Sequence, residues 1–198
     1  MKYSSIIYAL RYYAVFLREE AMYKSTIFAI AFLSLVSVSF VTDSSANAQN
    51  KKTILSFKTM YGVDGPFVGE SNPIRGVNGD ELPWEIEKSI SGKLETNGHL
   101  KISVRGLVFK DDLSVPPELI GKNDETEFRG LVSCLTEVGN NVVTQNVVTA
   151  GFPANEDGNS VINTNIQLPN PCVAPIIMVL AGSENKWFAV TGFETEEE

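Results

Sequence analysis

Apolar and polar side chains alternate along much of the chain from Lys52 onward, and this period of two constrains the fold more than any other feature. The alternation is clearest in residues 84–95, WEIEKSISGKLE, and in residues 100–109, LKISVRGLVF. Successive side chains of a β-strand point to opposite faces, so this pattern is typical of antiparallel strands with one buried face. The apolar face is predicted to consist of Trp84, Ile86, Ile90, Leu94, Leu100, Ile102, Val104 and Val108.

The stretch TNGH at residues 96–99 predicts a tight hairpin turn between these two segments. A two-residue loop would pair Glu95 with Leu100 and would bring a carboxylate to the apolar face. A three-residue loop at residues 96–98, with a left-handed glycine bulge at Gly98, avoids this and is the predicted connection. Its register pairs Leu94 with Leu100, Ile90 with Val104 and Ile86 with Val108.

Further strand patterns follow one another with turn residues between them, and no segment after residue 48 has a convincing helical period. This predicts an all-β fold in one domain, residues 49–193: an antiparallel β-sandwich of about eight strands, immunoglobulin-like or a related Greek key. A β-barrel is the alternative. Residues 173–181 are apolar on both faces, so they are expected to form a central, covered strand. The other predicted strands are residues 53–61, 127–138, 141–152, 160–168 and 186–193.

The N-terminal region predicts export. Residues 22–48 have one positive charge, an uncharged apolar run at 26–41 and the small residues of an A-x-A site, so we expect a signal peptide cleaved after Ala48. An uncleaved anchor is the alternative, but its apolar run is shorter than the roughly 20 residues of a spanning helix. Residues 1–21 are interpreted as an over-extended N-terminus, with an unusually long signal n-region as the alternative. Residues 194–198, ETEEE, are predicted to be a solvated acidic tail.

The charge of the exported part excludes some partners. Removal of residues 1–48 leaves 150 of the 198 residues and takes four of the 16 basic and three of the 24 acidic side chains, so the net charge becomes −9. Nucleic acid and anionic lipid both call for basic patches, so neither is an expected partner. No membrane span is expected after removal of the signal. The predicted location is extracytoplasmic: the periplasm, the cell surface or the medium.

The chain has two cysteines, Cys134 and Cys172, 38 residues apart in strand-like segments. Disulfides persist in the oxidising compartments that exported proteins enter, so the two are predicted to form a disulfide. Two buried free thiols are the alternative. A catalytic thiol is not favoured, because the only histidine, His99, is in a predicted turn and no base with an orienting partner is evident.

Two long loops hold most of the candidate ligand residues. Residues 62–83 are rich in glycine and proline, and long loops are often functional. Residues 110–127 add further carboxylates, and so does the NEDGNS stretch at residues 155–160. Calcium prefers such oxygen ligands, but the spacing is not that of an EF-hand, so ordinary solvated turns are the alternative and no cofactor is required. The candidate ligand or metal loop comprises Asp64, Glu70, Arg75, Asp80 and Glu81.

Motifs for catalysis are missing: there is no nucleophile elbow, no zinc-protease helix motif and no P-loop. No catalytic residue is assigned, and the chain is predicted to be a non-catalytic binding or envelope-associated module with a carbohydrate or protein ligand. The alternative is an extracytoplasmic carbohydrate hydrolase that uses carboxylates of the two loops. Its sugar platform would come from Tyr61, Phe67, Trp84, Trp187 and Phe188, which are otherwise expected in the core.

Four segments resemble a group of uncharacterised small exported microbial proteins with a β-rich domain. They are IRGVNGDELPW at 74–84, FRGLVSC at 128–134, LPNPCVAPIIMV at 168–179 and WFAVTGF at 187–193. The resemblance covers most of residues 60–193. It implies a secreted β-rich domain, and it implies no activity, ligand or catalytic residue.

Overall fold

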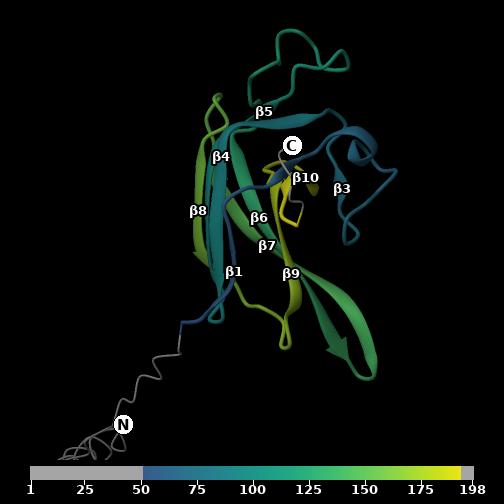
Figure 1. Cartoon of the computed structure of the whole chain (residues 1–198), viewed down its shortest axis with the longest axis vertical. Coiled ribbons are helices and arrows are strands. Elements are labelled where there is room, and N and C mark those ends of the chain that lie inside the picture. Colours follow the sequence, from purple (N-terminus) through teal and green to yellow (C-terminus); the bar gives the residue numbers. More distant parts are fainter. Residues whose placement is uncertain (1–50, 193–198) are drawn as a thin grey trace, which may run out of the picture. The chain divides into compact units, whose positions relative to one another are not determined.

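The computed structural model describes residues 51–192, which fold into two stacked β-sheets (Figure 1). Sheet A has the strand order β1-β4-β5-β8, and sheet B has the order β2-β10-β9-β6-β7 with β3 beside β10. All strand pairs are antiparallel except the pair of β3 and β10. The strands are β1 (Thr53–Phe57), β2 (Tyr61–Gly62), β3 (Asn78–Gly79), β4 (Trp84–Glu95), β5 (His99–Phe109), β6 (Glu127–Val138), β7 (Asn141–Pro153), β8 (Ser160–Asn165), β9 (Val173–Ala181) and β10 (Lys186–Val190), with a 3-10 turn η1 at Gly65–Phe67.

The predicted all-β sandwich is confirmed, and the barrel alternative is wrong for the described residues, because each sheet ends in free edge strands and does not close on itself. The structure has ten strands where the pattern predicted about eight, since β2 and β3 are only two residues long. The predicted strand 53–61 is also divided. Its first half, β1, belongs to sheet A and its second half, β2, belongs to sheet B, because the chain crosses between the sheets at residues 58–60.

The β4–β5 hairpin has the predicted turn and most of the predicted register. Gly98 has a φ of +81° and its amide donates to the carbonyl of Glu95, as expected for the three-residue loop. Leu94 is opposite Leu100, and Ile90 is opposite Val104, as predicted.

The predicted pair of Ile86 and Val108 is wrong, because Ile86 lies opposite Leu107. A β-bulge between Ile86 and Ser89 places residues 87 and 88 opposite Gly106 alone. Gly106 has a φ of +69°, and a Cβ there would come within 3.1 Å of the Lys88 amide nitrogen. Glycine thus permits the bulge, and the bulge shifts the register of the rest of the hairpin by one residue.

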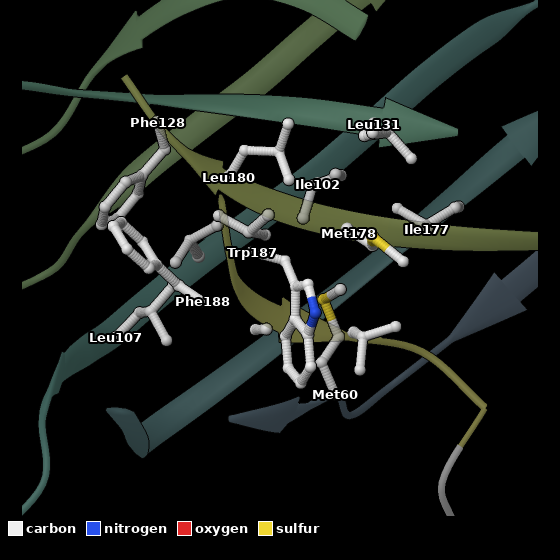
Figure 2. Packing of buried hydrophobic residues seen from close by; sticks show 14 of the residues in the cluster. Met60, Ile102, Leu107, Phe128, Leu131, Ile177, Met178, Leu180, Trp187 and Phe188 are labelled. Carbon is white, nitrogen blue, oxygen red and sulfur yellow. The ribbon is translucent and has the colours of Figure 1, made fainter. Parts of the chain in front are cut away.

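The middle of sheet B, formed by β10 and the C-terminal half of β9, is buried on both faces. Its inner face packs on sheet A, with Phe188 stacked on Trp84 of β4. Trp187, the preceding residue, points to the other face and lies 6.2 Å from Phe67 of the 62–83 loop between ring centroids. Figure 2 shows the two side chains pointing apart, Phe188 toward Phe128 and Trp187 toward Met60. The 62–83 loop therefore covers the outer face of sheet B and forms a second apolar layer with it.

The strand that was predicted to be central and covered is β9, which pairs with β10 on one side and β6 on the other. Its residues 177–181 are all buried. A strand that is apolar on both faces needs cover on both, and here sheet A covers one face while the 62–83 loop covers the other.

The disulfide between Cys134 and Cys172 is present, with Cα atoms 5.0 Å apart. Cys134 is in β6, and Cys172 immediately precedes β9, the neighbour of β6 in sheet B. The bond therefore joins two adjacent strands of one sheet, and no free cysteine exists. A disulfide of this kind fits an extracytoplasmic protein.

No helix in residues 51–192 has the length and apolar character required to cross a membrane. The predicted over-extended segment 1–21, the signal peptide 22–48 with its cleavage site, and the acidic tail 194–198 lie outside the described residues.

Candidate functional site

The five predicted ligand residues of the 62–83 loop do not form one site. Asp64 begins the 3-10 turn, where its Oδ1 accepts the amide of Gly65. Its Oδ2 accepts a hydrogen bond from Lys110 Nζ at 2.5 Å, an ion pair that raises the pKa of Lys110. Glu70 is exposed, and no hydrogen bond or ion pair of its side chain occurs among the described residues. Asp64 is thus a structural cap and the counter-ion of a lysine from the other long loop.

Arg75 lies over the outer face of sheet B. Its Nη2 donates to the carbonyl of Ala174 at 3.2 Å, and its own carbonyl accepts the side-chain amide of Asn146 in β7. These two bonds tie the loop to β9 and β7. Arg75 therefore fastens the covering loop, and it does not join the acidic residues near it in sequence.

Asp80 and Glu81 are the two predicted residues that the structure does bring together, and Glu184 joins them. The carboxylate oxygens of the three residues lie within 4.8 Å of one another. Lys186 Nζ bonds to both Glu81 and Glu184, and the second distance is 2.8 Å. The hydrogen bond from Lys186 lowers the pKa of Glu81. An ammonium group therefore already pairs with two of the three carboxylates, and a calcium ion would have to displace it.

Asp80 also has a structural role. Its Oδ2 accepts the indole N–H of Trp84 at 2.8 Å in the buried layer. Burial raises the pKa of Asp80, although the hydrogen bonds from Trp84 and Leu82 act in the opposite direction. A buried carboxylate that is held in this way anchors the end of the covering loop to β4.

The aromatic residues do not form a sugar platform. Trp84, Trp187 and Phe188 are at most 2% exposed, as the core interpretation expected. Tyr61 and Phe67 are half-buried and pack edge-on against each other. Stacking on a sugar requires an exposed ring face, and the three buried rings offer none.

The open polar surface of the molecule is instead the outer face of sheet A. The inward residues of β4, β5 and β8 are mostly buried and apolar, while the outward positions in the middle of the sheet are mostly hydroxyl, amide or basic. In the middle of the face the charged outward residues are all basic, while Glu85, Glu87 and Glu95 lie toward the two ends of β4. The outward residues in the middle of the face are Ser89, Ser91, Lys93, Lys101, Ser103, Arg105, Val161 and Asn163.

Two open hollows share Lys88, which is exposed in the β4 bulge beside the equally exposed Glu87. One, of about 410 Å³, also contains Lys58 and Lys110 among its lining residues. The other, of about 460 Å³, also contains Arg105. We call these two hollows the cationic track. Bulges are found next to binding sites because they re-aim a side chain, and this bulge places Lys88 where the hollows meet.

The cations of the track are largely available to a ligand. Lys58, Lys88 and Arg105 form no ion pair with any other described residue, whereas Lys110 is paired with Asp64. Asp64 and Glu85 are the acidic residues of the first hollow, and the second hollow has none. Hydroxyl and amide groups of Ser89, Ser103 and Asn159 line the same surface. This arrangement suits a ligand with spaced anionic groups and many hydroxyls.

Reasoning from the sequence missed this site, since it considered the net charge of −9 and the acidic loops only. The usable signal was local: LKISVRG carries its charges on one face of a strand, and both charges are positive. Lys88 could not have been placed, because its position depends on the bulge. Comparison of the chain with protein-family models, with curated proteins and with solved structures gave no match.

Proposed function

We propose that this protein is an exported, non-catalytic binding module that holds an acidic polysaccharide on the cationic track. The observation that carries the proposal is the concentration of unpaired Lys58, Lys88 and Arg105 along two hollows that share Lys88, in an otherwise acidic chain. Exposed charges interact over only about 8 Å at physiological ionic strength, so the local charge decides what binds there and not the net charge.

The ligand class follows from the chemistry of the face. Guanidinium and ammonium groups bind carboxylates, and serine and asparagine side chains exchange hydrogen bonds with sugar hydroxyls. The face is also broad and open, as a polymer requires. Uronic acid residues along a chain would supply both kinds of group at regular intervals.

A non-catalytic role is supported by the state of the loop carboxylates. Asp64, Asp80 and Glu81 are each held by a partner, respectively Lys110, Trp84 and Lys186. The alternative, a carbohydrate hydrolase, would need a general acid and a second carboxylate about 5 to 9 Å apart on opposite sides of a sugar bond. Asp64 and Glu85 of the first hollow are the pair that it would have to use.

Export is part of the proposal. It is supported by the signal-like sequence at residues 22–48 and by the Cys134–Cys172 disulfide. Mass measurement of the exported protein is expected to show an N-terminus at Gln49, whereas a full-length mass in the membrane fraction would contradict the signal peptide.

The binding proposal is tested by affinity electrophoresis and titration calorimetry with polygalacturonate and with dextran, a neutral glucan. Polygalacturonate is expected to bind, with an affinity that falls as salt is added, and dextran is not. The double variant Lys88→Glu/Arg105→Glu should lose about tenfold or more in affinity, since each reversal replaces an attraction by a repulsion.

Lys51→Glu/Lys52→Glu is the matched control, because it reverses two charges at exposed lysines that line neither hollow and form no ion pair with a described residue. Equal binding of dextran, or the same loss in the control as in the double variant, would exclude the proposal. Release of reducing sugar from polygalacturonate, abolished by Asp64→Asn, would favour the hydrolase instead.

A further inference from the structure

Strand β7 is an edge strand of unusual length and composition. It is the last strand of sheet B and runs for 13 residues, whereas β1 and β8 at the edges of sheet A have five and six. No side chain from Asn141 to Pro153 is charged, and the only proline is the final residue. The outer edge of β7 therefore presents a long row of backbone N–H and C=O groups with no strand beside it in the described part of the chain.

Natural proteins usually protect such edges with lysine, proline, bulges or very short strands, because an open edge is a template for another strand. The one irregularity of β7 lies near its C-terminal end, between the partners of Arg129 and Leu131. The first half, residues 141–148, has none of these protections. Instead it exposes valine, with Val142 68% and Val148 39% exposed.

The hairpin also extends past its support. The last pair between β6 and β9 is Leu135 with Val173, while β6 and β7 stay paired to Val138 and Asn141. Figure 1 shows this hairpin extending away from the other strands at the lower right. A two-stranded hairpin is only marginally stable in water by itself, so a third strand along β7 would stabilise it.

The side-chain pattern of β7 indicates which strand could pair with its open edge. Residues 141–149 read NVVTQNVVT, and antiparallel pairing of two copies about Gln145 places Val142 opposite Val148 and Val143 opposite Val147. Thr144 then lies opposite Asn146. The apolar residues of each copy therefore meet apolar residues of the other on both faces of the ribbon. A two-fold axis at Gln145 produces this match, as a self-complementary interface requires.

The charge distribution also favours a second copy of this chain as the partner of β7. Two copies of a chain with a formal net charge of −8 repel each other over most of their surfaces. Along β7 they meet without any charge, so this edge offers a second copy a long approach free of like-charge contacts. A partner selected by charge complementarity has nothing to recognise there.

We propose that β7 is a homodimerisation edge, at which β7 of one copy pairs antiparallel with β7 of a second copy about Gln145 and joins the two B sheets into one. The bonds formed are the backbone hydrogen bonds of a β-ladder, with valine pairs on both faces. The proposal is independent of the ligand of the cationic track, which lies on sheet A. In the dimer each copy still presents its own track.

Sedimentation velocity of the exported protein over a wide concentration range tests the proposal. The wild-type protein is expected to form a dimer. Gln145→Lys and Gln145→Glu should each weaken it about tenfold or more, because each places two like charges opposite one another at the axis. An equimolar mixture of the two variants should restore the dimer, since the charges are then opposite in sign.

Asn163→Lys adds the same charge on β8, the exposed edge of sheet A, and should leave the dimer unchanged. Gln145 is exposed, so its variants should keep the thermal stability of the wild-type monomer, compared at a dilution at which the wild-type dimer has dissociated. If one does not, Val142→Thr/Val148→Thr is used in its place to weaken the dimer.

A wild-type protein that stays monomeric at its highest soluble concentration would overturn the proposal. So would a dimer, or a larger aggregate, that the Gln145 variants and their mixture do not change. Polygalacturonate binding by the monomeric Gln145→Lys variant reports on the cationic track separately, so failure of one proposal is not mistaken for failure of the other.

Discussion

The outer faces of the two sheets differ, because one is covered by a loop and the other is open. Sheet B presents apolar side chains such as Trp187 outward, and the 62–83 loop folds over them. Sheet A presents serine, asparagine and basic residues outward, and its face stays open. Both sheets are built from strands of the same period, so the difference depends on which residues occupy the outward positions.

This comparison changes how the long loop is interpreted. A long loop rich in glycine and acidic residues suggested a binding site, but residues 62–83 form the lid of a second apolar layer. The part of the surface with binding chemistry is the plain hydrophilic face of the other sheet. A loop that packs on an apolar sheet face is held in place by those buried contacts, so it is less able to rearrange around a ligand.

The largest effect is expected from removal of the tryptophan beneath the loop. Trp187→Ala leaves a cavity in a fully buried layer and should lower the free energy of unfolding by about 3 to 5 kcal/mol. Val161→Ala on the open face of sheet A is the matched truncation, at a residue that is 56% exposed, and should change it by less than about 0.5 kcal/mol. Urea denaturation measures the free energy of unfolding of both variants, and equal losses would contradict the difference between the covered face and the open face.

Loss of the disulfide should be next in size. Cys172→Ser opens a closed loop of 38 residues within sheet B and should lower the free energy of unfolding by about 2 to 5 kcal/mol. Chemical denaturation of the oxidised wild-type protein, the reduced wild-type protein and the variant gives the values. Reduced wild type should resemble the variant, and no difference among the three would show that sheet B does not depend on this bond.

Calcium binding tests whether the acidic cluster at the edge of the covering loop is occupied by Lys186 in place of a metal ion. Lys186→Met should leave Asp80, Glu81 and Glu184 without their cation and create a calcium site. Calcium at ten times the dissociation constant would then stabilise the variant by about 1.4 kcal/mol. The wild-type protein should show little heat in the same titration. Strong binding by wild type would instead make this cluster the metal site that the acidic loop suggested.

A smaller effect is expected from the buried carboxylate at the loop end. Burial raises the pKa of Asp80, so its contribution to stability is present below the pKa of the unfolded state, about 4, and is lost as pH rises through the folded-state value. Asp80→Asn can still accept the indole hydrogen bond and cannot ionise. It should therefore unfold at a higher temperature than wild type at pH 7, with the difference disappearing below about pH 4. A difference that is constant with pH would contradict this.

The smallest stability effect belongs to the open face. Lys101 lies directly opposite Lys93 across the β4–β5 ladder, where like charges repel. Lys101→Ser should leave the free energy of unfolding, measured by urea denaturation, unchanged or raise it by less than about 0.5 kcal/mol. A large loss of stability would show that this face is structural, like the outer face of sheet B.

Several parts of the fold could be predicted, most of them because they depend on neighbouring residues. The turn at residues 96–98 follows from the glycine and from the face on which Glu95 would lie. The central position of β9 follows from its apolar character on both faces. Pairing of Cys134 with Cys172 follows from there being only two cysteines and from the expected compartment.

What the sequence by itself determined was thus the all-β class, the hairpin turn and the covered strand, because alternation and turn chemistry act over a few residues. It also determined the disulfide, because the chain has only two cysteines. The tertiary structure decided the crossing of the chain at residues 58–60, the bulge that aims Lys88, and the use of the 62–83 loop as a cover. Each of these depends on which surfaces meet when distant segments pack, and burial of an apolar face carries more free energy than the local preferences of a loop. The partners of the loop carboxylates, Lys110 and Lys186, come from positions far along the chain for the same reason.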